Sequence, residues 1–251
     1  MKRALTVAAL LGSAGLAGSA RAESAAEILK LADEAYGAYK DLTLESTMII
    51  KEPGATTGRE IGMITQAKGD KKLVRFVSPG DIKGMGFLTE SRDVMYALLP
   101  AFGNRVRRMG THVKNQGFMG SDASFEDMST STWAEAWQPT LTGQDDKTWT
   151  LDLVLLPGHD GEFQHERIQV DKKIHQVTRI EYVDPAGKVV KVQTRGDWRL
   201  DAGTKHYTPE WIRITDHRRN DHITEIHSTK SVADAGLADD TFTQRNLVRG
   251  Q

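Results

Sequence analysis

Histidines and carboxylates near the C-terminus are the residues whose spacing first suggests chemistry. Imidazole and carboxylate groups are common zinc ligands. The order His222-x-x-Glu225-x-His227 matches neither the HExxH nor the HxxEH arrangement of zinc enzymes. We therefore expect the solvated end of a hairpin here, and no metal site. The residues concerned are Asp216, His217, Asp221, His222, Glu225 and His227.

Other catalytic arrangements are also missing from the sequence. The mature chain has no G-x-S-x-G nucleophile elbow, no Walker A loop and no strand-linked G-x-G-x-x-G. Its 34 acidic residues offer many carboxylate pairs for glycoside hydrolysis, but the sequence singles out none of them. We predict that the protein is not an enzyme and that it uses no cofactor.

A basic run in the middle of the chain suggests binding. Arg105, Arg107 and Arg108 lie on a predicted short strand and could contact a lipid headgroup or a partner protein, because guanidinium groups bind phosphate in a bidentate way. Alternatively, one arginine pairs with Glu126 or Asp127 and fixes the intervening loop to the sheet, which is the interpretation we favour.

The N-terminus has the pattern of a secretory signal. Lys2 and Arg3 precede an apolar run of small residues, and Ala20-Arg21-Ala22 fits the small-x-small cleavage rule. The run is shorter than the roughly 20 residues that cross a bilayer. The sequence has no cysteine, which excludes disulfides, thiolate metal sites and a lipid anchor on an N-terminal cysteine. We predict a signal peptide at residues 1–22 and a soluble periplasmic chain after cleavage.

Charge argues against one class of partner. Without Lys2, Arg3 and Arg21 the chain has 30 basic and 34 acidic residues, a formal charge of −4. A surface that follows nucleic-acid phosphates needs a basic excess. We therefore expect no nucleic-acid partner.

The elements that position these residues are mostly strands. A capping box at Ser24 and Glu27 predicts a helix over residues 24–40. Short strands joined by tight turns then predict an antiparallel meander, and no linker divides residues 23–251 into two domains. The predicted strands are 42–50, 60–68, 73–78, 86–91, 94–99, 105–108, 148–156, 165–171, 177–184, 188–200, 210–218 and 222–229.

One connection is exceptionally long. Residues 109–147, here called the long connection, contain several glycines and a possible short helix at residues 134–137. Connections of this length are uncommon in compact domains and are often functional. We expect the long connection to cross the open face of a curved sheet and, with the N-terminal helix, to form its lid. Within it, Ser121, Asp122 and Ser124 are expected to shape a turn.

Two strands, residues 94–99 and 151–156, are apolar on both faces. Either they are central strands covered on both sides, or their concave side lines a cavity for acyl chains. Methionines fit the second interpretation, because thioether side chains adapt to irregular apolar ligands. Gap filling in an ordinary core would explain the methionines equally well.

Three segments resemble the LolA-like outer-membrane lipoprotein-sorting protein family. Residues 93–128, DVMYALLPAFGNRVRRMGTHVKNQGFMGSDASFEDM, are similar to the family's sequence of a strand, LP, xRVRR and FMGSDxSYEDL. Residues 79–88, PGDIKGMGFL, are similar to its P-x-D-I-K-G-x-x-F-L segment. Residues 237–247 resemble its D-x-x-F-T-x-x-x-L ending, with Phe242 and Leu247 as the buried anchors.

The resemblance implies a mainly β (α+β) fold. A curved antiparallel sheet would form an incomplete (half) barrel, with helices covering its concave face, as in LolA and LolB proteins. It also implies a periplasmic role in lipoprotein sorting.

We therefore predict a monomeric periplasmic carrier that binds acyl chains of a lipid or lipoprotein in an apolar cavity. It would pass them to an inner- or outer-membrane protein partner. The alternative is an accessory or scaffold subunit of an envelope export or transport complex that carries no ligand, with the arginine strand as a protein interface. The residues expected near the cavity are Phe87, Leu88, Met95, Tyr96, Leu98, Phe118 and Met119.

Overall fold

The computed structural model describes residues 23–91, 94–99, 103, 105–110, 117–124, 127, 132–159 and 161–249. The predicted signal peptide, residues 1–22, lies outside these ranges. So do Phe125, Glu126 and Met128, which belong to the segment that carries the family resemblance.

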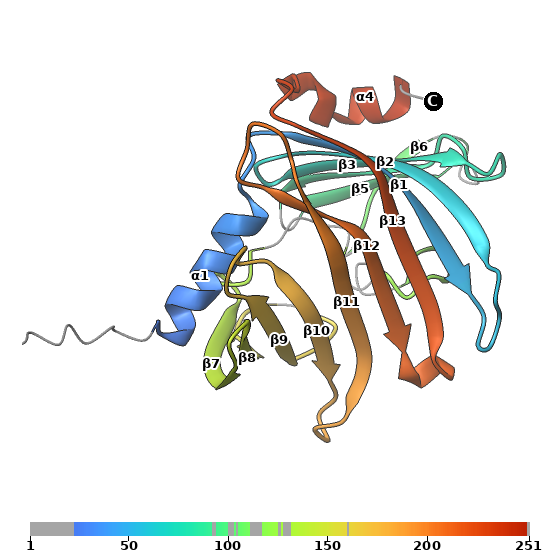
Figure 1. Cartoon of the computed structure of the whole chain (residues 1–251). Coiled ribbons are helices and arrows are strands. Elements are labelled where there is room, and N and C mark those ends of the chain that lie inside the picture. The colour runs from blue at the N-terminus through green and yellow to red at the C-terminus, as the bar shows by residue number, and fades with distance from the viewer. Residues whose placement is uncertain are drawn as a thin grey trace, which may run out of the picture.

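The described strands form one antiparallel sheet of thirteen strands (Figure 1). The first half of the chain supplies six of them. They are β1 (Leu42–Lys51), β2 (Arg59–Lys68), β3 (Lys71–Ser78), β4 (Gly86–Ser91), β5 (Val94–Leu99) and β6 (Arg105–Arg108). Each of the strands β2–β6 pairs with the strand before it, as the short turns between the alternating segments predict.

The second half of the chain supplies seven strands. They are β7 (Trp137–Gln144), β8 (Thr148–Leu155), β9 (His165–Asp171), β10 (Val177–Val183), β11 (Val189–Leu200), β12 (Tyr207–Asp216) and β13 (His222–Ala233). The last strand, β13, pairs with β1, where Met48 lies opposite Ile226. This pairing joins the two halves, and β6 and β7 are the edges of the sheet. The sheet is therefore curved but not closed, which confirms the predicted half-barrel.

Strand β7 was not predicted. Its burial alternates along its whole length, as expected for a strand with one covered face. Pro139 and Gly143 weaken the sequence signal, because both residues are unfavourable within a sheet. Proline is tolerated on an edge strand, and β7 is one. A short helix was expected at residues 134–137; residues 134–136 form a turn instead, and Trp137 begins β7.

The helical segments are short. They are α1 (Ala25–Tyr36), η2 (Phe118–Gly120), η3 (His217–Arg219), η4 (Asp239–Phe242) and α4 (Gln244–Arg249). Ser24 and Glu27 form the predicted capping box, but α1 ends at Tyr36, with Gly37 as its C-cap, rather than near Lys40. In the described part of the chain, no helix has the length and apolar character needed to span a bilayer.

Two apolar clusters occupy the concave face. Helix α1 lies beside β7–β10 (Figure 1), where Ile28 and Leu29 pack with residues such as Leu151 and Ile168. In the other cluster, Phe118 of the long connection packs with residues of β1–β5 and β12. Helix α1 and residues 117–124 of the long connection therefore cover the concave face as predicted for the lid, whereas residues 137–144 of the connection form strand β7 instead.

A third cluster lies on the convex face. Leu88 and Leu98 of the sheet pack there against Phe242 and Leu247 of the C-terminal segment. Both tail residues are buried, as predicted. Figure 1 shows α4 on the outer side of this part of the sheet, away from α1. Gly86 allows this close approach, because a Cβ at that position would lie 2.9 Å from Leu247 Cδ1.

Candidate functional site

A cavity of about 190 Å³ lies on the concave face next to the last residue of α1, Tyr36. Its walls come from β1–β3 on one side and β11–β13 on the other. For scale, an apolar cavity of about 150 Å³ holds a benzene molecule, whereas sites for drug-sized ligands measure roughly 300–1,000 Å³. The enclosed volume therefore suits a segment of an acyl chain rather than a whole lipid.

The walls of the cavity are largely apolar because of strand periodicity. Residues two apart in a strand face the same side of a sheet. Leu42 and Leu44 of β1 consequently share the wall with Met63 and Ala67 of β2. The opposite wall includes Ile212, Ile214 and Ile226 from β12 and β13.

One end of the cavity is polar and basic. Lys72, on β3, is only 8% exposed, although it follows the same periodicity as Val74. Arg195 of β11 and Tyr36 also line this end. The charge of Lys72 is the main reason why the pKa of Tyr36 is lowered; burial opposes the shift, and Arg195 and a hydrogen bond with Lys72 add to it.

A smaller cavity of about 100 Å³ adjoins this polar end. The two cavities share Tyr36, Asp127, Gln193 and Arg195 as lining residues. The Gln193 amide is oriented by its neighbour: with its oxygen turned toward the guanidinium, that oxygen lies 2.7 Å from Arg195 Nη2 and 2.8 Å from Nε. The partition between the two cavities is thus made of polar side chains.

Asp127 is held in this partition by β10 and β11. Lys191 Nζ donates to Asp127 Oδ2 at 2.9 Å, and the Tyr182 hydroxyl donates to Oδ1 at 3.2 Å. Burial opposes ionisation of Asp127, but the charge and hydrogen bond of Lys191, with hydrogen bonds from Ser124, lower its pKa overall. Burial likewise opposes ionisation of Lys191, and Asp127 nevertheless raises its pKa, so both partners are charged.

For Asp127, this pairing corrects one of the two alternatives that the sequence left open. Asp127 does fix the long connection to the sheet, but through Lys191 rather than through an arginine of β6. The three arginines of β6 are exposed on the edge strand. The other candidate partner, Glu126, lies outside the described residues.

His206 and Asp201 form a second buried polar pair at the cavity wall. His206 Nδ1 lies 2.8 Å from Asp201 Oδ2, and Thr208 Oγ1 donates to the same oxygen at 2.7 Å. Burial lowers the pKa of His206 more than Asp201 raises it. His206 is therefore neutral near pH 7 and adds no positive charge to the cavity.

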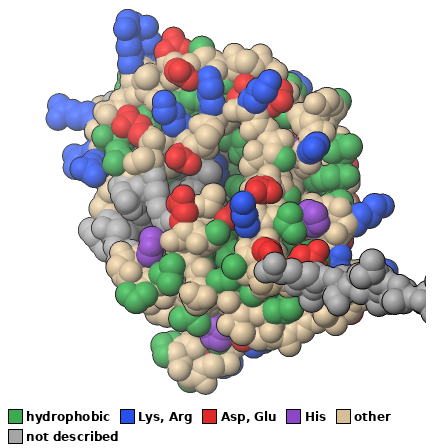
Figure 2. All heavy atoms as spheres, turned by 90° about the vertical axis from the view of Figure 1, so that its left-hand side faces the viewer, with side chains coloured by type: hydrophobic (Ala, Val, Ile, Leu, Met, Phe, Trp, Pro, Cys, Tyr) green, Lys and Arg blue, Asp and Glu red, His purple; other side chains and the backbone are tan. Residues whose placement is uncertain are grey.

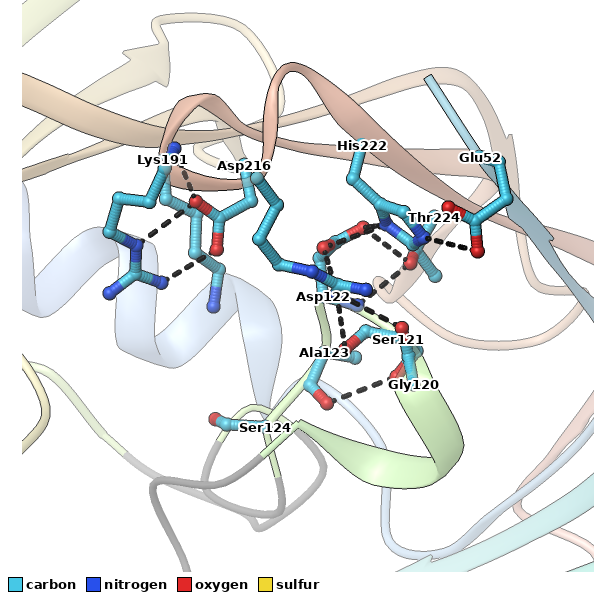
Figure 3. A network of polar contacts seen from close by, with 12 residues as sticks. Glu52, Gly120, Ser121, Asp122, Ala123, Ser124, Lys191, Asp216, His222 and Thr224 are labelled. Atoms are coloured by element: carbon cyan, nitrogen blue, oxygen red, sulfur yellow. Dashed lines mark hydrogen bonds and ion pairs between the residues drawn. The ribbon is translucent and has the colours of Figure 1, made fainter. Parts of the chain in front are cut away.

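A buried carboxylate locks the long connection to β13 (Figure 3). Asp122 Oδ2 accepts from Thr224 Oγ1 at 2.8 Å and lies 2.7 Å from His222 Nδ1. The backbone N–H of Asp122 donates to the Thr224 hydroxyl, also at 2.8 Å. Arg219 Nη1 donates to Asp122 Oδ1 at 2.7 Å and to the carbonyl oxygen of Gly120 at 3.0 Å. This network holds the chain around Phe118 over the concave face.

The network corrects two sequence predictions. His222 is buried against Asp122 and is not part of a solvated hairpin end, whereas His217 is partly exposed and pairs with Asp221 across the turn. Asp122 reaches across to β13 instead of shaping its own turn. Ser124 does shape the local turn, through hydrogen bonds with Asp127. No group of three or more potential ligands among the described residues could hold a metal ion.

The residues predicted for the cavity fall into separate places. Phe87, Phe118 and Met119 belong to the concave cluster, where Phe118 stacks on Phe76 with 4.4 Å between ring centroids. Met95 is buried and shares a face with Ala97 of that cluster. These side chains fill the concave face beside the cavity and do not form its wall.

The other three are on the wrong face. Leu88, Tyr96 and Leu98 point to the convex side and pack with the C-terminal segment. Successive residues of a strand face opposite sides, so Phe87 and Leu88 cannot both point to the concave face. The two-sided apolar character of β5 therefore reflects a strand covered on both sides, which was the alternative interpretation.

The residues that do line the cavity had a weak sequence signal. Lys72 shares one face of β3 with Val74 and Phe76. A charged residue on the same face as buried apolar residues is unusual and could have pointed to a binding site. Arg195 and Tyr36 gave no comparable signal, because only the pairing of β11 and the position of α1 bring them to Lys72.

Comparisons with known proteins agree with this architecture. Residues 68–249 match a family model described as an uncharacterized protein family. The sequence has no match among curated proteins. A domain assigned to an outer membrane lipoprotein-sorting protein from Vibrio parahaemolyticus superposes with a TM-score of 0.79 and 22% identity, covering 90% of this chain and 98% of that one.

Two further crystal structures are similar. A DUF1329 family protein from Desulfovibrio piger has a TM-score of 0.80 and 23% identity, covering 90% of this chain and 99% of that one. A LolA superfamily protein from Nitrosomonas europaea has a TM-score of 0.73 and 16% identity, covering 90% and 100%. At these identities the likeness establishes the fold.

Proposed function

The chain belongs to a family of uncharacterized proteins, DUF1329, and has the fold of the LolA superfamily; on this premise, we propose that it is a periplasmic carrier of acyl chains. It binds the chains of a lipid or lipoprotein in its concave cavity and passes them to a membrane protein. It acts without catalysis.

The observation that carries the proposal is the cavity of about 190 Å³ between β1–β3 and β11–β13. Each methylene moved from water to an apolar site contributes about 0.8 kcal/mol. An acyl chain in transit between membranes therefore needs an apolar shelter, and the walls at Leu44, Met63 and Ile226 supply one. A chain longer than the enclosed volume would continue past the mouth of the cavity or displace part of the lid.

The lid itself supports loading and release. Among the described residues of the long connection that precede β7, Asp122 bonds to β13 and Asp127 to β11. These few polar contacts can be exchanged for contacts with water while the strands of the sheet stay paired. This segment is therefore the one that moves when cargo enters.

The surrounding features fit a periplasmic carrier. The predicted signal peptide would direct the chain to the periplasm. Figure 2 shows hydrophobic side chains scattered among charged ones on the α1 side, as suits a protein that travels through water. Transfer would use the exposed Arg105, Arg107 and Arg108, which can approach lipid phosphates or an acidic partner surface.

The same three arginines also suit the second candidate, an accessory subunit of an envelope complex that carries no ligand. An exposed basic edge strand is a plausible protein interface in either case. The two functions differ in whether hydrocarbon enters the cavity.

Lipid extraction from protein purified from its native periplasm separates the two candidates. We expect co-purifying acyl chains in the wild type and at least a fivefold loss in Leu44→Trp, because the indole would fill the cavity. Leu200→Trp is the matched control, since Leu200 is 50% exposed on β11. Wild-type protein without lipid that also fails to bind a fluorescent fatty acid would favour the accessory role. Equal lipid content in Leu44→Trp and the wild type would contradict the location of the site.

A further inference from the structure

We infer that the polar end of the cavity, formed by Lys72, Arg195 and Tyr36, binds an acidic headgroup, so that the cargo is an anionic amphiphile with a carboxylate or a phosphate. This inference rests on the carrier function proposed above. It adds the chemical class of the cargo, which an apolar cavity alone does not specify.

The first argument is the burial of Lys72. Lysine is almost never fully buried without a partner, because removing an ammonium from water is costly. The Tyr36 hydroxyl lies at the same end of the cavity and interacts with the charge of Lys72. No carboxylate within the described ranges forms an ion pair with Lys72, so a phenol stands where a carboxylate is expected.

The second argument is the position of Arg195. Its guanidinium is half-buried at the same end of the cavity, and the oxygen that it contacts belongs to the neutral amide of Gln193. The charges of Lys72 and Arg195 both act on Tyr36, so the two cations lie near the same hydroxyl group. Arginine binds carboxylate and phosphate through two parallel hydrogen bonds, and a neighbouring lysine adds a point charge.

The third argument is the charge balance of the wall. Asp127 is the one carboxylate among the described residues that line the cavity, and Lys191 already occupies its Oδ2. With His206 neutral, Lys72 and Arg195 give this end a surplus of positive charge. Most of the remaining wall surface is apolar, with Val74 beside Lys72 on the same face of β3. Hydrocarbon and anion sites are therefore contiguous.

The test compares three probes with the same hydrocarbon chain: dodecanoate, dodecyl phosphate and neutral dodecanol. Their affinities are measured by displacement of a fluorescent fatty acid, at a pH where the acids are ionised. We expect the wild type to bind at least one anion about 10-fold more tightly than the alcohol, the effect of one charge-assisted hydrogen bond. Dodecanoate and dodecyl phosphate distinguish a fatty-acid cargo from a phospholipid-like one.

Variants then test which residues cause the preference for anionic probes over the alcohol. Lys72→Met keeps the length and apolar character of the side chain, and it should bring the anion-to-alcohol ratio close to one while alcohol binding is retained. Lys71→Met is the matched control, since Lys71 is adjacent on β3 and faces the other side of the sheet. Tyr36→Phe removes only a hydroxyl, and it should lower the ratio about threefold even if Lys72→Met folds poorly.

Each outcome decides a separate question. Equal wild-type affinity for all three probes would overturn the acidic-headgroup inference and leave the carrier function standing. An unchanged ratio in both Lys72→Met and Tyr36→Phe would also overturn it, because another site would then select the anion. Failure of every probe to bind the wild type would refute the carrier function itself.

Discussion

Replacing Asp122 with asparagine should lower the free energy of unfolding by about 2–3 kcal/mol, the value of hydrogen bonds to a buried charged group. The carboxylate is fully buried and is surrounded by three side-chain donors, from Thr224, His222 and Arg219. An amide offers one acceptor oxygen and turns two N–H groups toward these donors. At least one donor therefore loses its partner.

Two features keep the loss below the 3–5 kcal/mol expected for breaking a fully buried ion pair. Arg219 is 41% exposed, so its guanidinium can turn to water. The His222 ring can change tautomer and accept from the new amide. The network therefore relaxes in part around asparagine.

Urea unfolding followed by circular dichroism measures the change, and Asp221→Asn is the matched control. Asp221 is one residue from His222, but its carboxylate is 71% exposed. Its exposed pair with His217 should contribute less than about 0.5 kcal/mol. Thr224→Val, which removes the hydroxyl that both accepts from and donates to Asp122, should cost about 1–2 kcal/mol.

Limited proteolysis reports the local effect. If the network fixes the long connection, Asp122→Asn should be cleaved faster near Phe118 than either the wild type or Asp221→Asn. Equal unfolding free energies and equal cleavage rates in the two asparagine variants would refute the assignment of Asp122 as the lock.

Three further predictions concern stability. Glu225→Gln should be less stable than the wild type near pH 7 by about 1–2 kcal/mol after allowance for solvent screening. The hydrogen bond from Lys51, opposed by burial and reinforced by Arg213, lowers the Glu225 pKa to about 2. Its contribution is present above the unfolded pKa near 4.5 and disappears as the pH falls toward 2, so urea titrations of the two proteins should converge there. Phe242→Ala should cost about 3 kcal/mol by emptying the convex cluster; an unchanged urea midpoint would show that the C-terminal segment does not stabilise the sheet. Gly86→Ala should cost about 2 kcal/mol, since its Cβ would lie 2.9 Å from the carbonyl oxygen of Val74, and calorimetry showing the wild-type melting temperature would contradict this packing.

Features that depend on neighbours in sequence were predictable. The Ser24–Glu27 capping box forms as expected, because both partners lie within one turn of helix. Most strands were found within a few residues of their bounds, since the alternation of side chains is a local property. Strand β7 was missed because Pro139 and Gly143 hide its alternation, and only its place at the sheet edge makes them acceptable.

The candidate site was less predictable. An apolar residue such as Leu88 or Leu98 must be buried, but the pattern does not say which of two covered faces it meets. The C-terminal segment covers one face and thereby assigns both residues to the convex cluster. His222 and Asp122 are 100 positions apart in the chain, and no local rule connects them.

The sequence by itself determined the alternating strands and the absence of thiol chemistry, because these follow from residue types and short spacings. The half-barrel class came from the resemblance of its motifs to those of a known family. Only the tertiary structure decided where the cavity lies and that Lys72, Arg195 and Tyr36 meet at its end. They come from β3, β11 and α1, so their meeting depends on the curvature of the sheet and the pairing of β1 with β13. Contacts of this kind bring together groups far apart along the chain, which periodicity within a single strand cannot encode.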